Sequence, residues 1–178
     1  MKPSQVRCFW LMLLCFTMSC QFALAVGGET CALATVIPSL PYCDTGTTLG
    51  HVNDYAVPCA TGSNAPDVVY IYTPTITQVV SFSLCGSAFN TAIHIWRGCA
   101  PNGVLLCCND NFCGTQSCCT FTLQANVTHF IIVDGGIAGG GLLAGDYLLN
   151  VVAGNACPQT PCVQTCPFPN RDVEPLNN

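Results

Sequence analysis

The chain has 178 residues, a formal net charge of −5 and sixteen cysteines, and only 7% of its residues are charged. It contains just four Lys and Arg residues. Because affinity for nucleic acid depends on Lys and Arg that neutralise phosphates, this composition excludes a nucleic-acid-binding protein.

The first 25 residues have the pattern of a secretory signal peptide. Lys2 and Arg7 give a positive start, residues 8–18 form a short apolar run, and Ala23-Leu24-Ala25 offers small residues for cleavage. The apolar run is too short to predict a spanning helix, so we expect a protein that does not span the membrane. The mature chain is expected to begin near Val26.

Removal of this segment leaves Arg97 and Arg171 against nine carboxylates, a formal charge of −7, and thirteen cysteines. An exported chain with so many thiols is expected to oxidise them, so we predict a disulfide-bonded protein that is secreted, extracellular or on the cell surface. Thirteen is an odd number. At least one cysteine is therefore free, bonded to another chain or lost in processing, and we expect it to be Cys162 or Cys166.

Residues 26–66 are rich in turn-forming residues, and short β-branched and aromatic segments follow. Their spacing predicts a β-sandwich or barrel at residues 26–154. From residue 155 to 178 the pattern is lost and proline increases, so this part is expected to be a Cys/Pro-rich tail or linker. The predicted strand segments are 67–73, 77–85, 91–99, 103–108, 118–124, 128–135 and 146–153.

Alternation within these segments predicts which side chains face the core. Val80, Phe82 and Leu84 alternate with smaller or polar residues, which is typical of a strand with one buried face. His94 alternates with Ile93 and Ile95, so its side chain is expected on the outer face, as a surface or hydrogen-bonded residue. The glycine-rich residues 135–145 lack a following lysine or helix and predict a hairpin loop rather than a phosphate site.

Several segments together resemble a known family. "CALATVIPSLPYCDTGTTLGHVNDY", "APDVVYIYTP", "SFSLCGSAFNTAIHIW", "CCNDNFCGTQS" and "FIIVDGG" followed by "GDYLLNV" are similar to the bacterial pre-peptidase C-terminal domain family in its secreted, Cys-containing form. The similarity covers most of residues 29–153. It implies an all-β, jelly-roll-like antiparallel β-sandwich with disulfide staples, attached to secreted proteins and often beside a protease, without catalysis by the module itself.

Two positions depart from that family pattern. Relatives commonly have Asp-Thr where this chain has Asn90-Thr91, and Asn-Asp-Asp where it has Asn109-Asp110-Asn111. Each change removes a carboxylate from a loop, which lowers the expected affinity for calcium because that affinity depends on the number of charged oxygen ligands.

The stretch "CCNDNFCGTQSCC", residues 107–119, allows three interpretations. A zinc site is disfavoured because paired C-x-x-C knuckles are missing, and a redox site because C-x-x-C is missing altogether. A disulfide staple fits best: if the flanking segments form a hairpin, Cys107 faces Cys119 and Cys108 faces Cys118. A register slip would let Cys99 or Cys113 compete for Cys108, so the connectivity stays open.

Four acidic residues lie in predicted turns, where Asp either caps backbone amides or contributes to a weak calcium site. The candidate ligands are Asp44, Asp54, Asp110 and Asp134. Apart from weakly bound calcium, no cofactor is expected.

His51, His94 and His129 lie far apart in the sequence, and no nucleophile motif surrounds them, so the module is expected not to be an enzyme. Tyr70, Tyr72 and Trp96 are candidates for an aromatic platform that binds sugar rings.

The favoured interpretation is therefore a secreted, non-catalytic accessory or adhesion module that contacts an extracellular polysaccharide or protein. Covalent or tandem partner domains are compatible with it. The alternative is a fragment of a secreted hydrolase, such as a peptidase, whose catalytic domain lies outside this chain.

Overall fold

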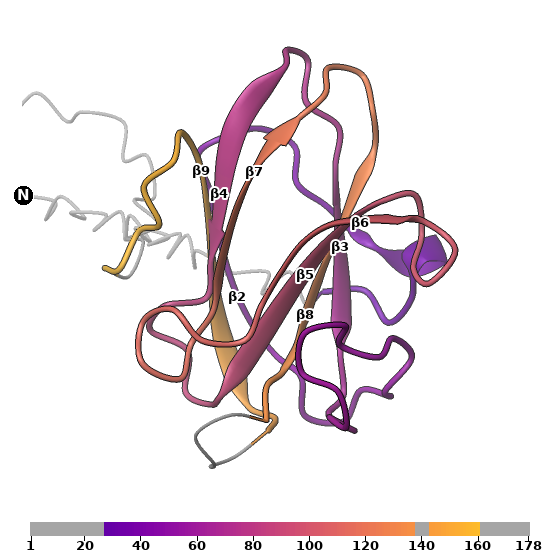
Figure 1. Cartoon of the computed structure of the whole chain (residues 1–178), viewed down its shortest axis with the longest axis vertical. Helices are drawn as coiled ribbons and strands as arrows, with labels where there is room; N and C mark the ends of the chain where they lie inside the picture. The colour runs from indigo at the N-terminus through magenta and orange to yellow at the C-terminus, as the bar shows by residue number, and fades with distance from the viewer. Residues whose placement is uncertain (1–26, 138–142, 161–178) are drawn as a thin grey trace, which may run out of the picture.

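The computed structural model describes residues 27–137 and 143–160, and this part of the chain forms a β-sandwich (Figure 1). The predicted signal peptide and the candidate odd cysteines, Cys162 and Cys166, lie outside the described residues. One 3-10 turn, η1 (Cys31–Leu33), precedes the described strands. These strands are β1 (Thr35–Val36), β2 (Tyr42–Thr47), β3 (Val68–Tyr72), β4 (Gln78–Ser83), β5 (Thr91–Arg97), β6 (Val104–Asn109), β7 (Cys118–Leu123), β8 (His129–Gly135) and β9 (Asp146–Ala153).

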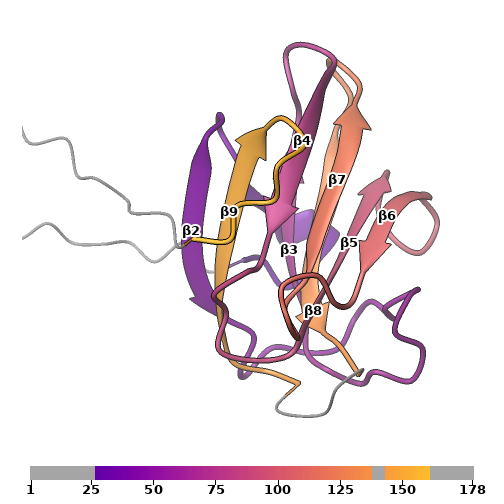
Figure 2. The same cartoon turned by 60° about the vertical axis from the view of Figure 1, so that its left-hand side comes forward.

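The strands form a five-stranded sheet in the order β1-β3-β8-β5-β6 and a four-stranded sheet in the order β2-β9-β4-β7. Every pair is antiparallel except β1 and β3. The chain crosses repeatedly from one sheet to the other, and Figure 2 shows the two layers side by side. The predicted fold class, an all-β, jelly-roll-like antiparallel β-sandwich with disulfide staples, is confirmed.

Each of the seven predicted strand segments contains a strand, but β1 and β2 lie in the part of the chain expected to be turn-rich. β2 has the sequence "YCDTGT", in which Asp44 and Gly46 both have low strand propensity. It is nevertheless paired with β9 along its whole length, from Tyr42 opposite Val151 to Thr47 opposite Asp146. Pairing across the sheet therefore determines this strand, and local sequence does not.

The inner faces of the two sheets form one core. Val80, Phe82 and Leu84 are fully buried, as their alternation predicted. They pack with Tyr70 and Ile93 of the opposite sheet in a single hydrophobic cluster. At about 25 cal/mol per Å² of buried apolar surface, this cluster is the main source of stability.

The outer face of the five-stranded sheet is also buried, because a long segment packs over it. We call residues 48–67 the cover loop. Tyr55 of this loop packs on a second cluster that contains Trp96 and Ile132, and Val57 packs on Ala92. His94 lies on this outer face, as predicted, but it is completely buried rather than at the surface. The alternation of side chains indicates the face of a strand and does not show what covers that face.

The outer face of the four-stranded sheet is covered in part by residues 154–158, which we call the C-terminal strap. The Ser81 hydroxyl donates a hydrogen bond to the Gly154 carbonyl at 2.8 Å, and the Ser83 hydroxyl donates one to Pro158 at 2.6 Å. Cys157 forms a disulfide with Cys118 of β7. The first residues of the predicted tail are therefore bonded to the sandwich.

Disulfides join these layers to one another. Cys107 is bonded to Cys119, as predicted, but β6 and β7 are not a hairpin: β6 pairs with β5, and β7 pairs with β4. This bridge therefore crosses between the sheets. Cys43 is also disulfide-bonded. The other described bridges are Cys31–Cys99, Cys59–Cys108, Cys85–Cys113 and Cys118–Cys157.

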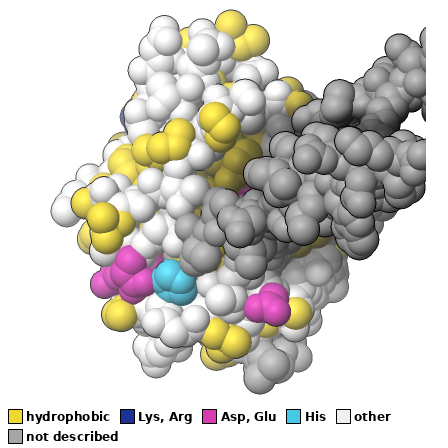
Figure 3. All heavy atoms as spheres, turned by 180° about the vertical axis from the view of Figure 1, so that it is seen from behind, with side chains coloured by type: hydrophobic (Ala, Val, Ile, Leu, Met, Phe, Trp, Pro, Cys, Tyr) yellow, Lys and Arg dark blue, Asp and Glu magenta, His cyan; other side chains and the backbone are white. Residues whose placement is uncertain are grey.

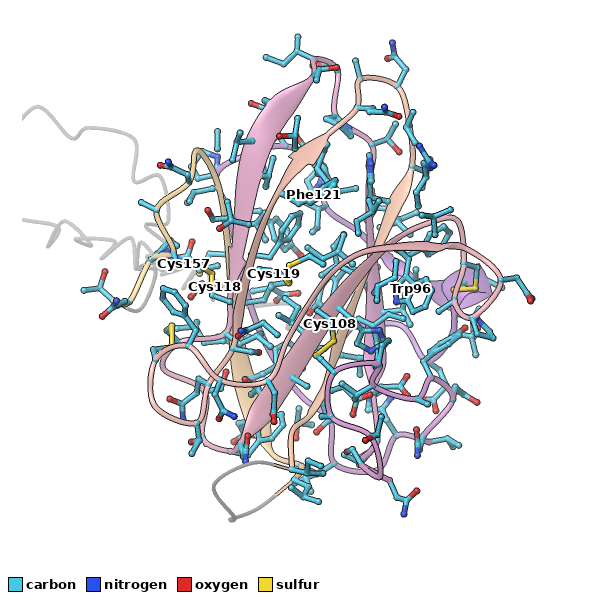
Figure 4. The ribbon with its side chains drawn as sticks, viewed as in Figure 1. Trp96, Cys108, Cys118, Cys119, Phe121 and Cys157 are labelled. Carbon is cyan, nitrogen blue, oxygen red and sulfur yellow. A yellow bond between two sulfur atoms is a disulfide. The ribbon has the colours of Figure 1, made fainter. Side chains whose placement is uncertain are left out.

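The expected bridge between Cys108 and Cys118 is wrong, because Cys108 is bonded to Cys59. Cys99 and Cys113, the alternative partners of Cys108, are bonded to Cys31 and Cys85. Neighbouring residues on a strand point to opposite faces, so only one cysteine of each adjacent pair can face the core. Figure 4 shows Cys119 directed between the sheets and Cys118 directed outward to Cys157. The outward-facing cysteines bond to the covering segments and not to each other.

Candidate functional site

The four predicted calcium ligands lie in different environments, and Asp44 is part of a tyrosine network. Its Oδ2 atom accepts hydrogen bonds from the hydroxyls of Tyr70 at 2.9 Å and Tyr42 at 3.1 Å. Oδ1 accepts one from the Thr45 amide at 2.9 Å. Burial raises the pKa of the Asp44 carboxyl, and the three hydrogen bonds oppose this shift.

The network continues from Tyr70 to Tyr147, whose hydroxyl oxygens lie 2.6 Å apart. The Tyr147 hydroxyl also accepts a hydrogen bond from the Gly27 amide at 3.0 Å. Burial strongly raises the pKa of Tyr70 and also raises that of Tyr147, so both hydroxyls keep their protons at neutral pH. The network therefore links Gly27 to Tyr147 of the four-stranded sheet and, through it, to Tyr70 of the five-stranded sheet. Its role is structural.

Asp134, the second candidate, lies on the outer face of the five-stranded sheet beneath the cover loop. Its Oδ2 atom is 3.7 Å from Nε2 of His94, which is too long for a hydrogen bond. Trp96 Nε1 donates to His94 Nδ1 at 2.7 Å, so the neutral imidazole carries its proton on Nε2, toward Asp134. Burial lowers the pKa of His94 to about 3 and raises that of Asp134 to about 8.

Asp67, which the sequence did not single out, completes this buried group. Its Oδ2 atom accepts hydrogen bonds from the amides of Asp54 at 2.8 Å and Tyr55 at 2.9 Å. Burial raises the pKa of Asp67 to about 7, and the nearby charge of Asp134 adds to the shift. We call Asp67, His94 and Asp134 the buried polar cluster. The two amide hydrogen bonds tie the middle of the cover loop to its last residue, Asp67, which directly precedes β3.

Asp54 and Asp110 lie elsewhere, in the cover loop and after β6 respectively. Asp110 approaches Gly136: a Cβ atom added there would lie 1.7 Å from Asp110 Oδ1 and 2.6 Å from Asn90 Oδ1. Asn90, which departs from the family pattern, and Asp110, which directly precedes the second departure at Asn111, therefore both lie against Gly136.

The structure does not gather these carboxylates into a calcium site. Within residues 27–137 and 143–160, no group of three or more His, Cys, Asp or Glu side chains is arranged to hold a metal ion. Asp44 is occupied by tyrosine hydroxyls and Asp134 is deeply buried. Weak calcium binding stays a prediction from the sequence.

All three histidines of the chain are described, and each has structural contacts. His51 Nδ1 pairs with Glu29, whose other oxygen accepts a hydrogen bond from the Val52 amide at 2.6 Å. His94 belongs to the buried polar cluster. His129 is buried, and burial lowers its pKa. None of the side-chain hydrogen bonds found in the described residues joins a histidine ring to a serine, threonine or cysteine side chain.

The proposed aromatic platform is wrong. Tyr70 is fully buried between the sheets, while Tyr72 and Trp96 are only 6% and 8% exposed. Tyr70 faces the interior, whereas Trp96 faces the cover loop. A sugar ring cannot stack on faces that are already covered, so these three residues do not form a binding surface.

Comparisons with known proteins find similar folds among solved structures. No protein-family model matches the chain, and no curated protein matches it. A solved structure of the pre-peptidase C-terminal domain of a collagenase from Bacillus anthracis is similar, with 14% identity and a TM-score of 0.43. The similarity covers 66% of this chain and 92% of that one. Among the described residues, no helix is long and apolar enough to cross a membrane.

Proposed function

We propose that this chain is a secreted, non-catalytic accessory or adhesion module that contacts an extracellular protein or polymer. The observation that carries the proposal is the use of its reactive side chains for structure. Eleven described cysteines are disulfide-bonded, and the three histidines are held by a carboxylate, an indole or burial. Bridges of this number are characteristic of exported proteins.

The alternative, a fragment of a secreted hydrolase, retains support from the resemblance of several segments to a family often found beside proteases. In that case the module serves a catalytic domain that lies outside this chain. Both proposals give the module itself the same non-catalytic role, and they differ in what is covalently attached to it.

Mass spectrometry of the exported protein under non-reducing conditions tests the proposal. We expect an N-terminus near Val26, the bridges described above and at most one free thiol. Hydrolysis assays with peptide, ester and glycoside substrates should give no activity above that of a reduced and alkylated control. Activity that follows the native protein through purification would contradict the non-catalytic role, and a longer precursor with a catalytic domain would favour the alternative.

A further inference from the structure

The charges of the described residues are separated between the two ends of the sandwich. The acidic end is formed by the cover loop, the loops 84–90 and 110–117, and the start of β9. The opposite end carries Arg97, the sole Lys or Arg in the described ranges. Six of the seven described carboxylates lie at or beside the acidic end: Glu29, Asp54, Asp67, Asp110, Asp134 and Asp146.

Four of these carboxylates reach the surface. Asp54 and Asp146 are exposed, and Glu29 and Asp110 are partly exposed. Figure 3 shows acidic side chains and a histidine in the lower half of one face, with hydrophobic side chains beside them. Since no described lysine or arginine lies among them, their negative potential is not neutralised locally and attracts cations.

Apolar side chains are exposed at the same end. Leu49 is 61% exposed, Val52 59% and Phe112 53%. Exposed apolar residues also occur at the opposite end, where Ile76 is 61% and Val104 51% exposed. Apolar exposure alone therefore does not distinguish the two ends. The combination of exposed apolar side chains with negative charge occurs only at the acidic end of the described residues.

The loops of the acidic end are joined to one another. Cys85–Cys113 links loop 84–90 to loop 110–117, and Cys59–Cys108 links the cover loop to β6. The Thr91 amide donates a hydrogen bond to the Thr115 carbonyl at 3.1 Å. Loops fixed in this way lose little conformational entropy on binding, which favours affinity.

We infer that the acidic end binds a cationic polypeptide segment that also carries apolar side chains. This inference rests on the proposed function and specifies its partner. Lys or Arg of the partner pair with Asp54, Asp110 and Asp146, and its apolar side chains pack on Leu49, Val52 and Phe112. Anionic polymers are repelled. Neutral sugars find no aromatic platform, because Tyr70, Tyr72 and Trp96 are buried.

The test uses the exported chain with its bridges intact and blocked peptides of about twelve residues, which are long enough to extend across several loops. One peptide contains Lys and Leu separated by Gly and Ser. A second replaces Lys with Glu, and a third replaces Leu with Ser. We expect calorimetry to detect binding of the Lys/Leu peptide alone, weakened about tenfold between about 50 mM and 300 mM salt as screening increases.

Paired variants locate the surface. Leu49→Ser with Phe112→Ser and, separately, Asp54→Asn with Asp146→Asn should each weaken binding about tenfold. Ile76→Ser with Val104→Ser, at the opposite end, is the matched control and should bind like the unaltered protein. Near-ultraviolet circular dichroism checks folding. If the apolar variant fails to fold, the charge variant tests the inference, because it removes no apolar contact. Unchanged binding by a folded charge variant would then contradict it.

Three results would overturn the inference: equal binding of the Glu/Leu peptide, equally tight binding of the Lys/Ser peptide, or equal weakening by the control variant. Failure of the proposed function looks different. A chain that is retained on extracellular matrix proteins but ignores cationic peptides has another binding surface. A chain that is retained on no extracellular material refutes the accessory role itself.

Discussion

The two outer faces of the sandwich are built from different residues, although each is covered by a segment that a disulfide holds in place. The face of the five-stranded sheet combines apolar side chains with the buried polar cluster, and the cover loop helps to remove most of them from water. The face of the four-stranded sheet presents hydroxyls such as Ser81 and Ser83 to the C-terminal strap. The face of the five-stranded sheet therefore needs its cover for stability, because uncovering it would expose apolar side chains to water. The hydroxyls of the four-stranded sheet can form hydrogen bonds with water instead.

Removing one bridge from each cover should give the largest difference between the faces. Cys59 and Cys108 are 49 residues apart and Cys118 and Cys157 are 39 apart, so chain entropy alone predicts losses of about 4 kcal/mol that differ by only about 0.2 kcal/mol. Because release of the cover loop also exposes Val57, we expect the Cys59→Ala, Cys108→Ala protein to be less stable by a further 1–2 kcal/mol or so. Urea unfolding measures both. Equal losses would mean that the cover loop packs too weakly to matter.

A rise in pH should weaken the first face and leave the second unaffected. The pKa values of Asp67 and Asp134 are raised to about 7 and 8, so the folded state binds protons that the unfolded chain releases near pH 4. Stability is therefore lost as the pH rises through 7 and 8, by about 2 kcal/mol between pH 6.5 and 8.5. The lowered pKa of His94 acts in the opposite direction, mainly below pH 6.5.

The midpoint of urea unfolding across this pH range provides the measurement. Asp134→Asn keeps the shape of the side chain without its titration, and it should flatten the dependence. A protein whose stability is constant from pH 6.5 to 8.5, or rises, would show that these carboxyls are ionised and accommodated in the folded state.

A hydroxyl beneath the C-terminal strap should contribute less to the free energy of unfolding than the cover loop does. Ser83→Ala removes the hydrogen bond to the Pro158 carbonyl and the one that the hydroxyl accepts from the Cys85 amide, and we expect a loss of about 1–2 kcal/mol, the usual net value of two such bonds. Thr122→Ala on the same strand layer, where the side chain is exposed, serves as the control and should change stability little. A loss of several kcal/mol for Ser83→Ala would mean that the strap is as important as the cover loop.

Calcium should have the smallest effect. With a dissociation constant in the weak extracellular range, an equal concentration of calcium stabilises the fold by only about 0.4 kcal/mol. We expect a slight rise in melting temperature with millimolar calcium and no dependence of folding on the ion. Magnesium is the control cation. Sub-micromolar calcium binding by calorimetry would show that ligands outside the described carboxylates form a strong site.

The strands with a clear alternation of β-branched residues could be predicted from the sequence. Val80, Phe82 and Leu84 form such a pattern, and their burial follows from it. β2 could not be predicted, because Asp44 and Gly46 disfavour a strand and only the pairing with β9 holds it. Side-chain periodicity can be read from a local sequence. A strand with low local propensity cannot be predicted in this way, because it depends on a pairing partner that is distant in the sequence.

The same limit explains the disulfides and the candidate site. The pair Cys107 and Cys119 lies within one short segment, whereas Cys108 is bonded to Cys59 in a loop that the sequence did not place. Asp67 was missed because it is an ordinary Asp at a strand start, and its burial depends on the cover loop. The separation of charge between the two ends likewise appears only when the topology brings distant loops together.

The cross-core bridge also determines how the module transmits force. Along the chain, Cys31 and Cys157 are 126 residues apart, which is a contour of about 430 Å when extended. The bridges give a much shorter covalent route: from Cys31 to Cys99, along eight residues to Cys107, across to Cys119, and through its neighbour Cys118 to Cys157. This route reaches only about 50 Å at full extension. Tension applied between these two cysteines is therefore limited by sulfur–sulfur bonds, and the oxidised module cannot extend beyond this length.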